Sequence, residues 1–181
     1  MLQASMGVST VGTEIAPDQT RAKGTRVSEQ QEVVHPRRYV VGVDGSEASI
    51  DALRWAVAEA KAHGGGDVHA VLVWEVPYGG LATSMAQGPY GLPNTTILEE
   101  EASLRLQSCI EALGDTSTVE VRAEVLEGQP ASVLLELSHK ADLVVVGSRG
   151  HGGFASLLLG SVSAQVVQHA HCSVVVVRPP D

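Results

Sequence analysis

Residues 143–163 read LVVVGSRGHGGFASLLLGSVS, and this stretch decides the fold. Its first four residues are all apolar, which is typical of a strand that is buried on both faces of a parallel sheet. Glycines follow at positions 147, 150, 152 and 153, and the segment closes with Gly-Ser-Val-Ser. The spacing of the residues after Gly160 predicts a helix from Ser161 to about His169. A buried strand that leads through a glycine-rich loop into a helix indicates an α/β protein.

The rest of the chain from Arg37 onward repeats this alternation of strand and helix. Apolar, β-branched runs predict strands, helical spacing predicts helices, and glycines mark several of the turns between them. The expected strands are 39–43, 68–76, 119–126, 143–146 and 174–177, and the expected helices start at Ser46, at 94 or 95, at 131 and at Ser161. We therefore expect an α/β fold with a five-stranded parallel sheet sandwiched by four helices, doubly wound as in Rossmann-like proteins.

Two segments do not fit the alternation. Residues 1–35 show no sustained period and few large apolar groups, so we expect a disordered N-terminal tail followed by one domain over 36–181. Residues 77–93 are rich in Gly, Pro, Ser and Tyr, and loops of this length are uncommon unless they are functional or mobile.

The composition excludes several classes of function. The net charge is −9 and the pI is about 5.2, whereas a nucleic-acid-binding surface needs clustered Lys and Arg. No run of 18 apolar residues is present to span a membrane, and the N-terminus lacks the pattern of a secretory signal. Cys109 and Cys172 have no metal-binding or redox spacing, and no set of ligands has the spacing of a metal site. We expect a cytoplasmic protein.

The loop after the fourth expected strand has the chemistry of a phosphate site. Glycines let the backbone approach an anion, and the N–H groups at the start of the Ser161 helix supply donors and a partial positive charge. Ser161 and Ser163 add hydroxyl groups, and Arg149 adds a cation. Asp44, at the end of the first expected strand, would share the crevice if the first and fourth strands were neighbours. A tight turn without a ligand remains the alternative, because the loop is neither a P-loop nor a dinucleotide fingerprint.

The spacing Gly147-x2-Gly150-x9-Gly160-Ser161 resembles the ATP-binding signature of universal stress proteins. Three further stretches resemble the same family: VVGVDGSEAS at 40–49, LVVVGSRGHGG at 143–153 and HAHCSVVVVR at 169–178. The sequence departs from the pattern at Ser173, where many members have proline, and in its long N-terminal segment.

The resemblance implies an adenine-nucleotide site that takes ATP, with or without Mg²⁺, and cyclic AMP is the alternative ligand. Trp74 is an alternative to Val73 as the second-strand position that touches the base. The expected site residues are Gly42, Val43, Asp44, Val73, Val146, Gly147, Arg149, Gly150, His151, Gly152, Gly153, Gly160, Ser161, Val162 and Ser163.

The resemblance also implies a homodimer paired through the last strand and a role in the stress response. No base that would activate water is evident, so we expect a nucleotide-dependent regulator with little or no turnover; slow hydrolysis is the alternative. An adenylate-transferring ligase would need a pyrophosphate-binding pattern such as S-G-G-x-D-S or H-x-G-H, and neither occurs. The sequence names no client protein.

Overall fold

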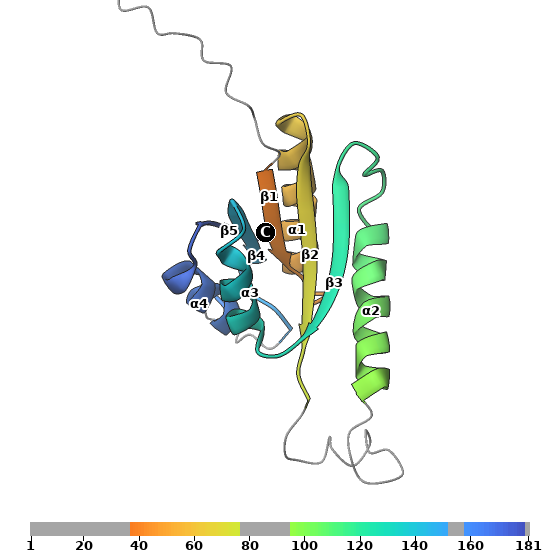
Figure 1. Cartoon of the computed structure of the whole chain (residues 1–181), viewed down its shortest axis with the longest axis vertical. Helices are drawn as coiled ribbons and strands as arrows, with labels where there is room; N and C mark the ends of the chain where they lie inside the picture. The colour runs from red at the N-terminus through yellow and green to blue at the C-terminus, as the bar shows by residue number, and fades with distance from the viewer. Residues whose placement is uncertain (1–36, 77–94, 152–157, 180–181) are drawn as a thin grey trace, which may run out of the picture. The chain divides into compact units, whose positions relative to one another are not determined.

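The computed structural model describes residues 37–76, 95–151 and 158–179 (Figure 1). The expected N-terminal tail and the expected long loop at 77–93 lie outside these ranges, as do Gly152 and Gly153. Within the described ranges, no helix is both long enough and apolar enough to cross a membrane.

Five parallel strands form one sheet in the order β3-β2-β1-β4-β5. The strands are β1 (Arg37–Gly42), β2 (Gly66–Trp74), β3 (Glu120–Glu127), β4 (Leu143–Gly147) and β5 (Ser173–Val177). The central strand is β1. Strands β2 and β3 extend the sheet on one side of it, and strands β4 and β5 extend it on the other. The expected neighbourhood of the first and fourth strands is confirmed, and their carboxyl ends form the switch point at which ligands bind in such sheets.

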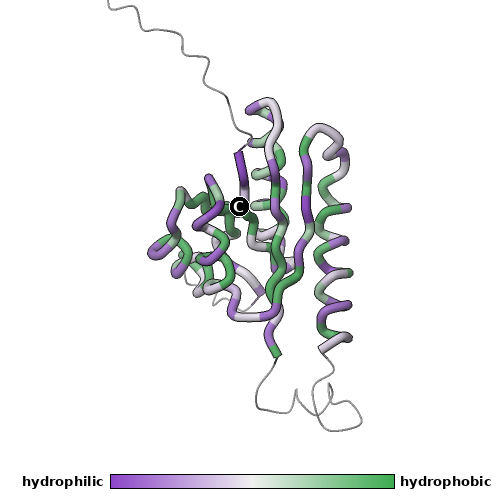
Figure 2. Tube along the Cα trace, in the orientation of Figure 1, coloured by the Kyte–Doolittle hydropathy of each residue, from purple (hydrophilic) through white to green (hydrophobic). Residues whose placement is uncertain are grey.

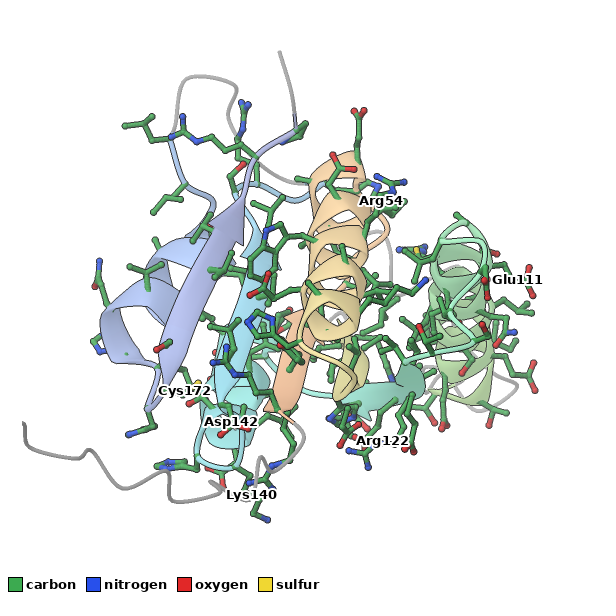
Figure 3. The ribbon with its side chains drawn as sticks, turned by 90° about the horizontal axis from the view of Figure 1, so that it is seen from above. Arg54, Glu111, Arg122, Lys140, Asp142 and Cys172 are labelled. Carbon is green, nitrogen blue, oxygen red and sulfur yellow. The ribbon has the colours of Figure 1, made fainter. Side chains whose placement is uncertain are left out.

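Four helices cover the sheet, two on each face (Figures 1 and 3). They are α1 (Glu47–Ala62), α2 (Thr95–Glu111), α3 (Pro130–Ser138) and α4 (Ser161–His169). Residues of α1 and α2 share one buried cluster with the sheet, and residues of α3 and α4 share the other. The predicted α/β class and the alternation of elements are confirmed.

The two faces of the central strands bury different side chains because side chains alternate along a strand. Val41 and Val145 lie in the cluster with α1, whereas Val40, Val144 and Val146 lie in the cluster with α3 and α4. All five are buried. This double burial explains the continuous apolar runs of β1 and β4, which Figure 2 shows as hydrophobic stretches at the centre of the sheet.

The structure corrects the predicted bounds of β2, which runs from Gly66 to Trp74 and not from 68 to 76. Its polar start pairs with β1, since Gly66 is opposite Arg37 in the ladder. Its other end, Trp74, pairs with the end of β3: the N–H of Gly128, the residue after β3, donates to the carbonyl oxygen of Trp74 at 2.9 Å. The pairing partner, and not the hydrophobic pattern of the strand itself, fixes both ends.

Candidate functional site

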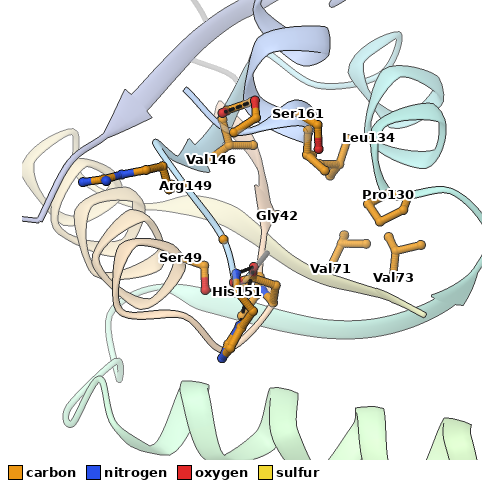
Figure 4. Close-up of a pocket in the computed structure, with 17 residues that line it drawn as sticks. Gly42, Ser49, Val71, Val73, Pro130, Leu134, Val146, Arg149, His151 and Ser161 are labelled. Atoms are coloured by element: carbon orange, nitrogen blue, oxygen red, sulfur yellow. Dashed lines mark hydrogen bonds and ion pairs between the residues drawn. The ribbon is translucent and has the colours of Figure 1, made fainter. Parts of the chain in front are cut away.

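A cavity of about 480 Å³ opens at the carboxyl ends of β1 and β4 (Figure 4). This volume falls within the range of about 300–1,000 Å³ that is usual for small-molecule sites. The cavity is lined by Gly42, Val43, Asp44, Ser49, Val71, Val73, Pro130, Leu134, Val146, Gly147, Arg149, Gly150, His151, Gly160, Ser161, Val162 and Ser163. Every expected site residue that the structure describes is therefore brought to one cavity.

Asp44 is held at the cavity by the turn between β1 and α1. Its Oδ1 accepts hydrogen bonds from the backbone N–H of Ser46 at 2.9 Å and from the Ser46 hydroxyl at 2.6 Å. Gly45 has a φ of +89°, a conformation that glycine adopts without strain. Ser46 also caps α1, because its hydroxyl oxygen accepts the N–H of Ser49 at 3.3 Å. The sequence Asp-Gly-Ser thus both turns the chain into α1 and holds the Asp44 carboxylate in place.

The glycine-rich loop reaches Asp44 from β4. The backbone N–H of His151 donates to Asp44 Oδ2 at 3.2 Å, and the His151 ring nitrogen Nδ1 lies 3.7 Å from the same oxygen. A side chain on Gly150 would overlap this carboxylate, and one on Gly147 would lie 2.7 Å from the backbone of Ala48 in α1. Both glycines are therefore required by close packing within the protein.

The start of α4 forms the opposite wall of the cavity. Its N-cap, Gly160, provides no side-chain hydrogen bond, so the first N–H groups of the helix have no capping side chain. The N–H of Gly160 donates to the carbonyl oxygen of Ser148 at 2.8 Å, which ties the helix start to the end of β4. The Ser163 hydroxyl lies 3.0 Å from the same oxygen and is buried, whereas Ser161 is exposed at the cavity. Ser163 thus braces the loop, whereas Ser161 lines the cavity with an exposed side chain.

Local contacts control the charge of Asp44. Burial favours the neutral acid and raises the pKa of Asp44, but hydrogen bonds from the side chain and backbone of Ser46 and from the backbone of His151 favour the carboxylate. Together these hydrogen bonds hold the pKa of Asp44 below its usual value. The site therefore offers an ionised acceptor at neutral pH.

An apolar wall faces Asp44 across the cavity and includes residues that the sequence analysis missed. Val71 and Val73 project from β2 on the same face, while Pro130 and Leu134 come from α3 (Figure 4). The period of two along a strand could have predicted Val71 once Val73 was assigned. Pro130 and Leu134 carried no such signal, because their place depends on how α3 crosses the sheet. Ser49 was also missed, although it lies one turn into α1 after Ser46.

Two of the expected residues differ in detail from their sequence-based roles. Arg149 lines the cavity, but its side chain extends away from Val146 and Ser161 in Figure 4. Trp74, the alternative to Val73, packs against the other core cluster, with α1 and α2. In the described ranges, no group of three or more His, Cys, Asp or Glu side chains could hold a metal ion.

Comparison with known proteins places this geometry in a family. The family model "Universal stress protein family" matches residues 35–178. A universal stress protein of Methanocaldococcus jannaschii is 36% identical over 149 residues, which cover 80% of this chain and 83% of that protein. A universal stress protein of Mycobacterium tuberculosis is 35% identical over 143 residues, which cover 77% of this chain but 47% of that protein. The chain thus spans about half the length of this mycobacterial relative.

Solved structures agree with the sequence relatives. The universal stress protein UspA from Lactobacillus plantarum has a TM-score of 0.64 at 26% identity, over 78% of this chain and 97% of that one. A universal stress protein solved in complex with cAMP has a TM-score of 0.50 at 26% identity, over 80% of this chain and 98% of that one. Since the family model covers the five strands and four helices that build the cavity, the chain belongs to the universal stress protein family.

Proposed function

We propose that this universal stress protein binds ATP in the cavity, with or without Mg²⁺, and acts as a nucleotide-dependent regulator of the stress response with little or no turnover. The α4 start would receive the phosphates through its N–H groups and Ser161. Asp44 would accept a hydrogen bond from the ribose or the adenine amino group. The apolar wall formed by β2 and α3 would cover the base.

The observation that carries this proposal is the presence of glycine at position 160. Gly147 and Gly150 are explained by packing, but Gly160 is not, because a Cβ there would meet no atom of the described residues closer than 3.5 Å. Its φ of −73° is open to any residue. The described part of the protein therefore does not require glycine at this point. A ligand that approaches the backbone at the start of α4 does.

Two further observations support an adenine nucleotide. The spacing Gly147-x2-Gly150-x9-Gly160-Ser161 resembles the ATP-binding signature of the family, and the relative solved in complex with cAMP is 26% identical. That complex also makes cyclic AMP the second candidate ligand. Calorimetric titrations with ATP and cyclic AMP against the same protein would rank the two ligands.

Low turnover follows from the roles that the polar groups already have. Both Asp44 oxygens accept hydrogen bonds from the protein, which suits an acceptor for the ligand more than a base for water. Binding the ground state tightly does not lower a barrier. We therefore expect ATP turnover well below ~1 per second, the low end of ordinary enzymes. A steady rate at or above that level would contradict the regulatory role.

Identification of the nucleotide that co-purifies with the chain tests the site directly. The purified protein is denatured, and the released small molecules are separated and identified by mass spectrometry. The double variant Gly160→Ala/Ser161→Ala should release no nucleotide while keeping its fold, because position 160 has room for a Cβ. Ser132→Ala, exposed on α3 and outside the cavity, is the matched control. Nucleotide retained by the double variant would refute the proposed site.

A further inference from the structure

Two helices, α1 and α4, start at the carboxyl ends of β1 and β4, and their first turns differ in charge and in hydrogen bonding. The start of α4 has no capping side chain and no acidic residue in its first turn. The start of α1 is capped by Ser46 and carries Glu47 in its first turn. Because a helix start binds an anion through free N–H groups, the two starts offer a ligand different chemistry.

The side chain of Ser49 closes the turn that leads into α1. Its Oγ atom accepts the backbone N–H of Asp44 at 3.3 Å and that of Gly45 at 3.2 Å. Its hydroxyl group also donates to the carbonyl oxygen of Ser46 at 2.9 Å. Two N–H groups of the turn are thereby bound by the protein, which withdraws them from an incoming phosphate.

The hydroxyl group of Ser49 has no hydrogen bond left to offer a ligand. A serine hydroxyl has one hydrogen to donate and two lone pairs to accept with, and the three contacts in the turn use all of them. Ser49 belongs to the cavity lining (Figure 4), yet it is 3% exposed. Ser49 therefore influences a ligand through the turn that it holds and not by hydrogen bonding to it.

The group that this turn presents to the cavity is the Asp44 carboxylate. Ser46 binds its Oδ1 atom, whereas Ser49 binds the backbone N–H of the same residue. Burial raises the pKa of Asp44, but the hydrogen bonds of Ser46, Ser49 and the His151 backbone outweigh burial and hold that pKa below its usual value. Loss of the Ser49 hydroxyl should therefore both loosen the carboxylate and raise its pKa.

We propose that Ser49 is a positioning residue for the nucleoside end of the ligand, which acts through Asp44 and keeps the start of α1 closed to phosphates. This inference rests on the proposed function. It explains why two helix starts at neighbouring strands would not compete for the phosphate chain, since the N–H groups at the start of α4 have no capping side chain.

Calorimetry with ATP and with adenosine tests which end of the ligand depends on Ser49. Ser49→Ala should weaken the binding of both ligands by the same factor, about 5- to 10-fold, because both contain the nucleoside. Ser49→Cys fills the space with a weak acceptor and should show a similar loss. Gly160→Ala/Ser161→Ala should instead lose ATP and keep adenosine affinity within about twofold, because it alters the phosphate end.

Ser138→Ala is the matched control for the loss of a buried serine hydroxyl. Ser138 is 1% exposed and lies outside the cavity lining. Its hydroxyl donates to the carbonyl oxygen of Leu135 at 2.6 Å and accepts the N–H of His171 at 3.0 Å, much as Ser49 bonds within its own turn. Ser138→Ala should lose stability, measured by urea titration, but bind both ligands like the wild type.

A pH profile separates the positioning role from a purely structural one. As the pH falls from neutral toward about 4, adenosine binding should weaken at a higher pH in Ser49→Ala than in the wild type, because the variant has lost hydrogen bonds that favour the Asp44 carboxylate. Ser138→Ala should keep the wild-type profile.

The outcomes distinguish this inference from the proposed function. Unchanged adenosine affinity in Ser49→Ala would overturn the positioning role, and so would a wild-type pH profile in that variant. A wild-type protein that binds neither ATP nor adenosine would overturn the proposed function itself, and the role of Ser49 with it.

Discussion

The carboxylate of Asp44 occupies the space that a side chain at position 150 would need. Its Oδ2 atom lies well inside the contact distance of a Cβ built on Gly150, and it accepts the N–H of the next residue, His151, at 3.2 Å. The turn after β1 and the loop after β4 are thus fitted to each other by contacts within the protein. The same oxygen belongs to the proposed nucleotide site, so loop packing and ligand binding depend on one group.

Gly150→Ala should therefore impair both stability and binding. The added methyl group displaces Asp44 or the loop, at a cost of about 1–3 kcal/mol in the free energy of unfolding, as overpacking usually costs. Urea titration measures this cost, and calorimetry with ATP measures the loss of affinity. Gly160→Ala is the matched control, because a Cβ at 160 has room. It should change stability by less than ~0.5 kcal/mol and still lose ATP. Equal stability of the two variants would contradict the packing argument.

Asp44 should also make stability depend on pH in a defined direction. Its native pKa lies below the unfolded value of ~3.9, so its ionised form favours the folded state. This contribution is complete above about pH 5 and is lost as the pH falls through the native pKa. The stability advantage of the wild type over Asp44→Asn should thus be constant above pH 5 and shrink toward pH 3. An advantage that stays constant down to pH 3 would show that the hydrogen bonds do not depend on the charge.

Local chemistry allowed much of this fold to be predicted from the sequence. The bounds of α4, Ser161 to His169, agree with the structure because glycine precedes the helix and its apolar spacing ends there. Ser46 was predicted as the cap of α1, since serine after Asp-Gly satisfies the first N–H groups of a helix. The loop residues from Gly147 to His151 were assigned to the cavity for the same reason: a strand, a glycine loop and a helix start lie next to one another in the chain.

Contacts between distant segments could not be predicted. Leu134 and Pro130 line the cavity because α3 crosses the end of β1, and no spacing within α3 reveals this crossing. The contact of Arg105 with Gly45 joins α2 to a turn 60 residues away by number, and an exposed arginine on a helix carries no signal of its own. Sequence patterns report the secondary structure of each segment, whereas the wall of a cavity depends on tertiary packing.

Gly42 and Leu134 should show coupled energetics across the cavity floor. A Cβ on Gly42 would lie 2.9 Å from the Cδ1 atom of Leu134, which is 2% exposed. Gly42→Ala alone should cost about 1–3 kcal/mol, and Leu134→Ala about 2–5 kcal/mol. In the double variant the new methyl group enters the space that Leu134 vacates, so the total should be about 1 kcal/mol less than the sum. Urea denaturation of the four proteins completes the cycle.

A second cycle supplies the control for this coupling. Leu53 of α1 is as buried as Leu134 but belongs to the cluster on the other face of the sheet. Gly42→Ala combined with Leu53→Ala should therefore be additive within ~0.5 kcal/mol. Coupling of equal size in both cycles would mean that Gly42→Ala disturbs the sheet as a whole and does not act through Leu134.

The two edges of the sheet differ in a way that bears on assembly. The edge strand β3 carries four charged side chains, Glu120, Arg122, Glu124 and Glu127, and such charges discourage pairing with another strand. The opposite edge strand, β5, reads Ser-Val-Val-Val-Val and has none. In the described ranges, no strand pairs with the outer edge of β5, and we therefore propose that two copies of the chain pair through this strand.

Val174→Pro should separate such a dimer without breaking the sheet. The carbonyl oxygen of Val177 accepts the N–H of Ser148 at 2.7 Å, so the backbone groups of Val177 and, by alternation, of Val175 face β4. The N–H of Val174 then points outward, and proline removes only a donor that the sheet itself does not use. We expect sedimentation equilibrium to give a dimer for the wild type and a monomer of unchanged circular dichroism for the variant. Val175→Pro, which removes an inward donor, should instead destabilise the fold. A variant that remains dimeric would place the interface elsewhere, because strand pairing at this edge depends on that N–H.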